Sequence, residues 1–238
     1  MNQFKISRFD RSSKALRQTG LLAALMFALS LVTTPALAHH AMDGKMPSNL
    51  LEGFMAGMAH PLIGPDHFAF IVAVGLLAAA RKQGILIPIA FVLAAMLGAG
   101  LHVAQINVPG VELLVSGSIV LFGVLLARKD SLNTWMVASL SAVAGLFHGY
   151  AYGEAIFGAE TTPLLAYLAG FTVIQLAISL LAFWMGKAIV SGRKSLGQAS
   201  EAQPASDKLR SAGLVICGVG LAFFVSQVIE VVFPVSGA

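Results

Sequence analysis

The stretch HPLIGPDHFAF, residues 60–70, places polar groups and helix breakers inside one of the most apolar parts of the chain. Two of the polar groups are imidazoles, His60 and His67, and the third is the carboxylate of Asp66. A carboxylate well inside a membrane span costs several kcal/mol by most scales, and such groups usually mark an ion or substrate path. The stretch therefore predicts a functional site, provided that it lies in a membrane span.

The spacing within this stretch predicts a break in the helix. His60 and Asp66 are six residues apart, which is not a whole number of α-helical turns, so their side chains point apart on an intact helix. Pro61, Gly64 and Pro65 between them disfavour an intact helix. A break lets the two side chains converge, as in the interrupted helices of transporters. Because nitrogen and carboxylate oxygen without thiolate suit nickel, cobalt, copper(II) or zinc, we interpret the stretch as a metal-binding kink.

The whole chain has the composition of an integral membrane protein. Of its 238 residues, 57% are hydrophobic and only 11% are charged, whereas about a quarter of the residues are charged in a soluble domain. Apolar segments long enough to cross a bilayer cover approximately 51–80, 84–104, 111–127, 134–153, 163–187 and 211–233. We therefore predict an all-α membrane protein, with six transmembrane helices over residues 50–238.

The first 38 residues have the pattern of a secretory signal peptide. Five Lys or Arg residues precede a short apolar run at 21–32 and an A-x-A sequence that ends at Ala38. Cleavage after Ala38 would leave His39 as the mature N-terminus. The alternative is an uncleaved first helix, which the short apolar run disfavours. Without residues 1–38 the charge is nearly balanced, so the net charge of +4 does not indicate a nucleic-acid partner.

The distribution of Lys and Arg predicts the orientation in the membrane. Both residue types occur in alternate connections, including the polar loop 191–210, and the other connections contain neither. Since basic residues are retained on the cytoplasmic side, we expect the loop 191–210 in the cytoplasm. The N-terminal tail 39–49, despite Lys45, and the C-terminus are then periplasmic at a bacterial inner membrane.

Further ionisable groups are expected on the outer side of the spans. His102 is near the end of the second span, and Glu112 is near the start of the third. His148 and Glu154 lie toward the outer end of the fourth span. The single cysteine, Cys217, excludes an internal disulfide and a thiolate-rich metal site. The candidate ligands are therefore imidazoles and carboxylates.

Two motifs resemble those of the HupE/UreJ family, small permeases linked to nickel supply for hydrogenase and urease, with some members serving cobalt. The stretch HPLIGPDHFAFIVAVG, residues 60–75, is similar to the family's H-P-x-x-G-x-D-H signature and the apolar run that follows it. LFHGYAYGEAIFGAE, residues 146–160, resembles F-H-G-x-A-H-G-x-E, but Tyr152 replaces the second histidine and Glu154 comes one position early. Glu112 resembles a further acidic position of the family. The signal peptide and the six spans extend the resemblance over essentially the whole chain.

We expect a permease, not an enzyme, that imports nickel or, second, cobalt and holds no prosthetic group. The expected ligands share an imidazole or carboxylate and are His39, His40, His60, Asp66, His67, His102, Glu112, His148 and Glu154. The tail captures the ion, the kink coordinates it, and the third and fourth spans hand it on. The expected partners are a transition-metal ion and the lipid bilayer, without nucleic acid. A periplasmic metal donor and a cytoplasmic metallochaperone are candidate further partners.

Other functions fit parts of the sequence. Methionine thioethers near the N-terminal tail favour copper(I), so copper is an alternative cargo. His102 and His148 lie at similar depth on different spans, an arrangement able to ligate a b-type haem. The usual sequence motifs of a membrane hydrolase do not occur in this chain. A non-transporting metal sensor or accessory protein is a further alternative. Asp66 also has a structural alternative, as a cap of the half-helix that follows Pro65.

Overall fold

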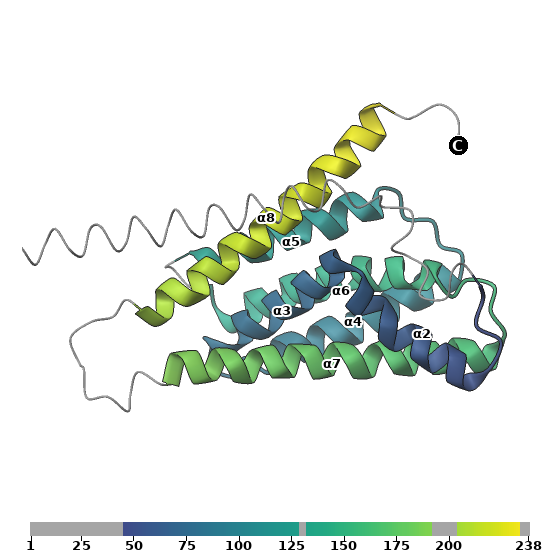
Figure 1. The fold of residues 1–238 in the computed structure, drawn as a ribbon, viewed down its shortest axis with the longest axis horizontal. Helices are drawn as coiled ribbons and strands as arrows, with labels where there is room; N and C mark the ends of the chain where they lie inside the picture. Colours follow the sequence, from purple (N-terminus) through teal and green to yellow (C-terminus); the bar gives the residue numbers. More distant parts are fainter. Residues whose placement is uncertain (1–44, 129–131, 192–203, 234–238) are drawn as a thin grey trace, which may run out of the picture.

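The structure, a computed structural model, describes residues 45–128, 132–191 and 204–233, and this part of the chain is all α-helical (Figure 1). The helices are α2 (Leu50–Ile63), α3 (Pro65–Ala79), α4 (Leu86–Val103), α5 (Val111–Ala127), α6 (Thr134–Glu154), α7 (Thr161–Ser191) and α8 (Pro204–Val232). The all-α prediction is thereby confirmed. The predicted signal peptide 1–38, His39 and His40, and most of the predicted loop 191–210 lie outside the described residues.

The helices follow the predicted apolar segments in order. Helices α2 and α3 together occupy the first segment, and α4 to α8 occupy one segment each. By length and composition, α4, α7 and residues 207–232 of α8 can each cross a membrane, and the bent pair α2–α3 raises the number of candidate spans in the described residues to four. Helix α5 is a shorter apolar helix. The number of six spans stays a prediction.

The predicted break in the first segment is confirmed, and it lies at Gly64. Helices α2 and α3 meet there at an angle of 80°. Gly64 has an extended backbone (φ −75°, ψ 104°), and Pro65 opens α3, where its missing N–H costs no helical hydrogen bond. Pro61 does not break the helix, because α2 continues through it to Ile63. The kink is therefore made by Gly64 and Pro65.

Glycines allow the helices of the bundle to approach closely. Helix α4 packs on α6, and a Cβ added at Gly149 would overlap the backbone carbonyl of Ala95. A Cβ at Gly145 would lie 2.6 Å from the Phe91 carbonyl oxygen. These contacts are the close membrane-helix packing that small residues permit.

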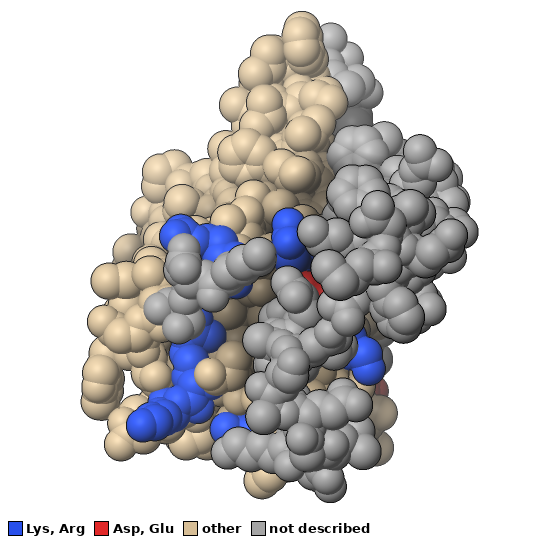
Figure 2. Space-filling model, turned by 90° about the vertical axis from the view of Figure 1, so that its left-hand side faces the viewer, with Lys and Arg blue, Asp and Glu red and all other residues tan. Residues whose placement is uncertain are grey.

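Basic residues gather at one end of the bundle and glutamates at the other. Lys and Arg gather on the end face that contains the end of α7 and the start of α8 (Figures 1 and 2). The basic residues in the described part at this end are Arg81, Lys82, Arg128, Lys187, Lys208 and Arg210. The glutamates of the described part lie toward the other end and are Glu52, Glu112, Glu154, Glu160 and Glu230. The fold thus places the alternating basic connections of the sequence on one side.

Arg81 fixes the basic end of α3. Its side chain is buried, and its guanidinium donates to the carbonyl oxygens of Leu77 (2.5 Å) and Leu132 (3.4 Å). Burial lowers the pKa of the Arg81 guanidinium from its ordinary value. A cation beside the last carbonyls of a helix is stabilised by the helix dipole. Arg81 therefore both ends α3 and ties the segment before α6 to it.

Candidate metal site

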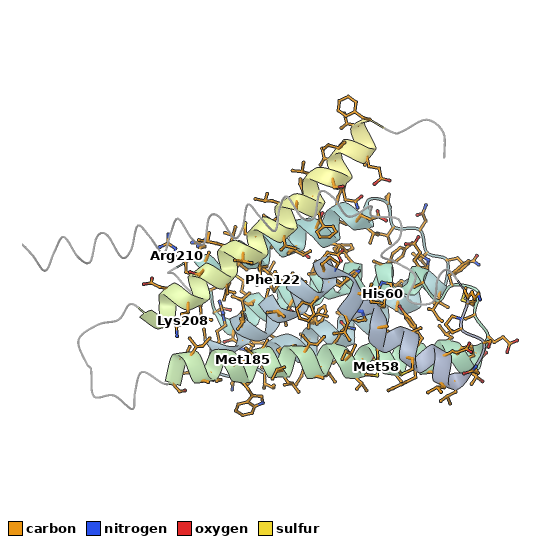
Figure 3. The ribbon with its side chains drawn as sticks, viewed as in Figure 1. Met58, His60, Phe122, Met185, Lys208 and Arg210 are labelled. Carbon is orange, nitrogen blue, oxygen red and sulfur yellow. The ribbon has the colours of Figure 1, made fainter. Side chains whose placement is uncertain are left out.

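The break at Gly64 brings two histidines together. His60 is in the last turn of α2 and His67 in the first turn of α3, and on an intact helix they would be about 10 Å apart along the axis. Their ring centroids are instead 5.6 Å apart. Both side chains are buried, with exposed fractions of 3% for His60 and 1% for His67. The kink therefore places two imidazoles side by side within the bundle, where Figure 3 shows His60.

Helix α6 adds a third imidazole. His148 is fully buried, and its Nδ1 lies 3.0 Å from Nδ1 of His67. Its Nε2 lies 2.9 Å from the hydroxyl of Ser118 on α5. Phe70 stacks on the His148 ring, with centroids 4.1 Å apart and planes at 25°. Both nitrogens of His148 are thus engaged by protein groups.

Two tyrosines complete this group of side chains. The Tyr167 hydroxyl donates to the Tyr152 backbone carbonyl (3.0 Å) and lies 3.0 Å from Nδ1 of His60. The Tyr152 ring lies 5.1 Å from the His60 ring and 4.4 Å from the His67 ring, measured between centroids. The Tyr152 hydroxyl is buried and has no hydrogen-bond partner among the described residues. We call His60, His67, His148, Tyr152 and Tyr167 the histidine cluster.

Asp66 lies at the edge of the histidine cluster. It is the second residue of α3 and is partly buried, and a Cβ added at Gly64 would lie 3.0 Å from Asp66 Oδ1 and 2.9 Å from Cδ2 of His67. The N-cap residue of α3 is Gly64, which has no side chain to cap the helix. The positive end of the α3 dipole favours a negative charge at this position. The structure therefore places a carboxylate beside the buried imidazoles.

The remaining described candidates lie away from the histidine cluster. The ring of His102 contacts Tyr150 and Phe157, with centroids 4.5 and 5.8 Å away. Glu112 and Glu154 are exposed, at the start of α5 and at the end of α6. Both lie at the surface of the end opposite the one where the basic residues gather. An ion that enters at that end would meet them before the kink, whereas the expected order places them after it.

The geometry leaves the identity of the metal ligands as a prediction. Within the described ranges, no three His, Cys, Asp or Glu side chains are arranged as a ready-made metal site. The cluster has the chemistry for a divalent ion of intermediate softness, since it combines imidazoles with a nearby carboxylate. An ion would require the cluster side chains to adjust around it.

Sequence reasoning missed several polar residues of the interior. Tyr167 and Ser118 hydrogen-bond to the cluster histidines. Gln175 on α7 is fully buried, and neither atom of its amide has a partner among the described residues. The signal that could have found them is a hydroxyl or an amide inside an apolar segment. Such residues are common enough in membrane helices that the signal alone does not single them out.

Comparison with known proteins gives a consistent answer. The family model described as HupE / UreJ protein matches residues 27–223. The chain is 33% identical over 144 residues to Protein HupE of Rhizobium leguminosarum bv. viciae, and the matched region covers 58% of this chain and 74% of that protein. No solved structure matches the chain. The chain therefore belongs to the HupE/UreJ family, a family of membrane transport proteins and not of enzymes.

Proposed function

We propose that the chain is a six-span inner-membrane permease that imports a divalent transition-metal ion, nickel first and cobalt second. The observation that supports this most strongly is the histidine cluster, because it gathers three imidazoles from α2, α3 and α6 in the buried interior next to Asp66. Ionisable groups inside a membrane bundle are costly and usually mark an ion path. Membership of the HupE/UreJ family supports a transporter of the nickel/cobalt type.

The proposed path runs from the acidic end of the bundle to the basic end. His39 and His40 capture the ion, and Glu112, Glu154 and His102 attract it to the outer end. His60, His67 and Asp66 then coordinate it at the kink. The membrane potential is worth about 2.3 kcal/mol per charge per 100 mV, so it supplies roughly 4.6 kcal/mol per 100 mV for inward movement of a divalent cation.

The alternatives receive less support from the site. A haem held by His102 and His148 requires a nitrogen of each, but both nitrogens of His148 already contact Ser118 and His67. Copper(I) favours thioethers, but Met46 and Met55 are exposed. Met58 lies on α2, two residues before His60 (Figure 3). Nitrogen and oxygen ligands therefore dominate, which favours nickel and cobalt.

Cellular uptake tests this function. Cells that express the protein should accumulate more nickel than cells with an empty vector, and cobalt should compete for uptake. Nickel, cobalt and copper are quantified by inductively coupled plasma mass spectrometry. A preference for copper, or accumulation no greater than in the vector control, would contradict the proposal.

The proposed orientation rests on the basic end of the bundle facing the cytoplasm. A cysteine at Ser200, in a Cys217→Ser background, should be protected from impermeant thiol reagents in intact cells. A cysteine at Thr161, at the start of α7, should react once the outer membrane is permeabilised. Reversed labelling of the two positions would invert the proposed direction of transport.

We also propose that residues 1–38 are a signal peptide that is removed after export. The purified mature chain should then begin with His39 and His40, whose free amine and imidazoles can chelate a metal ion together. N-terminal sequencing of the purified protein checks this. A sequence that begins within residues 1–17 would contradict both the cleavage and the amine chelate.

A further inference from the structure

Two hydroxyl groups in the interior have a defined hydrogen-bond direction. The Tyr167 hydroxyl lies 3.0 Å from the Tyr152 carbonyl oxygen, and the Ser118 hydroxyl lies 2.6 Å from the Val115 carbonyl oxygen. A carbonyl oxygen only accepts, and each hydroxyl has a single proton. Each hydroxyl therefore donates to its carbonyl and acts as an acceptor toward the histidine on its other side.

On the α7 side this direction sets the tautomer of His60. The Tyr167 oxygen is 3.0 Å from His60 Nδ1, and because that oxygen accepts, Nδ1 must carry the proton. The lone pair of the neutral imidazole is then on Nε2. Tyr167 is fixed in place by its own contacts, since it is 1% exposed and packs against Phe171.

On the α5 side, Ser118 determines the tautomer of His148, and His148 in turn determines the tautomer of His67. Ser118 accepts from His148, 2.9 Å away, so Nε2 of His148 carries the proton. His148 is fully buried and hydrogen-bonds to a serine and another imidazole, and burying an unpaired charge is costly. It is therefore neutral, with its lone pair on Nδ1. That lone pair faces Nδ1 of His67 at 3.0 Å, so His67 carries its proton on Nδ1.

We propose that Tyr167 and the Ser118–His148 pair are positioning residues that hold His60 and His67 in the same tautomer, with Nε2 as the electron-pair donor of both. The two nitrogens that can bind a metal ion then belong to the two histidines on either side of the Gly64 break. His148 orients His67 and is not itself a ligand in this arrangement. The meaning of this assignment for metal transport rests on the proposed function.

The arrangement follows a general feature of metal sites. A ligating histidine usually donates its other ring N–H to a hydrogen-bond acceptor, which fixes its tautomer and ring orientation. Here Tyr167 is the acceptor for the ring N–H of His60, and His148 is the acceptor for the ring N–H of His67. Removing such a partner typically lowers metal affinity or activity about 10- to 100-fold. Tyr167→Phe and Ser118→Ala are therefore each expected to lower nickel affinity by about that factor.

The tautomers can be measured without any metal, by ¹⁵N NMR of the metal-free protein with labelled histidine. Protonated and unprotonated nitrogens of a neutral imidazole have well separated ¹⁵N shifts, and single His→Gln variants assign the six histidines of the chain. In the wild type, we expect the proton on Nδ1 of His60 and His67 and on Nε2 of His148. A proton on Nε2 of either His60 or His67 would overturn the assignment.

The two branches of the network serve as controls for each other. Tyr167→Phe should mix the tautomers of His60 and leave His67 and His148 unchanged. Ser118→Ala should mix the tautomers of His148 and His67 and leave His60 unchanged. Tyr150→Phe and Ser141→Ala, which remove a partly buried and a buried hydroxyl that are each bonded to a backbone group, should alter none of the three.

The wild-type spectrum decides the assignment even if a variant does not fold. Unchanged tautomers in both folded variants would show that the hydroxyls do not set them, and would overturn the positioning role. A wild type with the expected tautomers but no metal uptake would contradict the proposed function and leave the assignment standing. Metal uptake by a wild type with the opposite tautomer on His67 would support the proposed function and contradict the tautomer assignment.

Discussion

Asp66→Asn is expected to abolish metal uptake while the protein still inserts into the membrane. The carboxylate lies beside the buried ring of His67, where its negative charge offsets the cost of moving a divalent cation out of water. Asparagine keeps the shape and the hydrogen-bonding groups but loses the charge. Insertion should become easier, because a neutral side chain is less costly in hydrocarbon than a carboxylate.

The measurement compares nickel uptake and membrane abundance for wild type, Asp66→Asn and a matched control. Glu160→Gln removes an exposed carboxylate before α7, away from the histidine cluster, and should leave uptake unchanged. If Asp66 were only a helix cap, asparagine would replace it almost silently, since it is also a good cap. Uptake by Asp66→Asn at the wild-type rate would therefore exclude Asp66 as a ligand.

Gly149→Ala is expected to be the most damaging single-methyl substitution in the helix pair α4–α6. The added Cβ would overlap the Ala95 carbonyl, and backbone atoms of two packed helices cannot yield as a flexible side chain can. Overpacking of this kind costs about 1–3 kcal/mol. Since His148 is the preceding residue, separation of the helices would also move it away from His67.

Gly100→Ala is the matched control for this substitution. Gly100 lies on α4, and a Cβ there would meet no atom within 4 Å. Alanine gains up to about 1 kcal/mol over glycine within a helix, so this variant should melt at or above the wild-type temperature. Thermal unfolding of the three proteins in the same detergent measures the difference. A wild-type melting temperature for Gly149→Ala would contradict the packing of α4 on α6.

The helices were the most predictable part of the molecule. The apolar segments 111–127 and 134–153 agree with α5 and α6 within one residue. Gly110 and Arg128 bound α5, and Asn133 caps the start of α6. Helix α8 begins at Pro204, seven residues before its apolar segment. Hydropathy does not indicate this extension, since a helix outside the bilayer satisfies its own backbone and needs no apolar side chains.

The break was predictable because Pro and Gly act locally, but its consequence for the side chains was only partly so. At the break, His60 is in ring contact with His67, because the 80° bend turns the first residues of α3 back toward α2. The motif that contains His148, residues 146–160, predicted that His148 belongs to the site. Its partner Ser118 was not expected, since contacts between helices depend on the packing register, which one sequence does not carry.

The most direct test of the central claim is nickel uptake by the purified protein in proteoliposomes with an inside-negative potential. The protein is inserted with its basic end inside, and internal nickel is followed with a trapped fluorescent indicator. We expect potential-dependent accumulation with wild type and none with Asp66→Asn. Wild-type proteoliposomes that accumulate no more nickel than protein-free liposomes would contradict the assignment of this chain as a nickel permease.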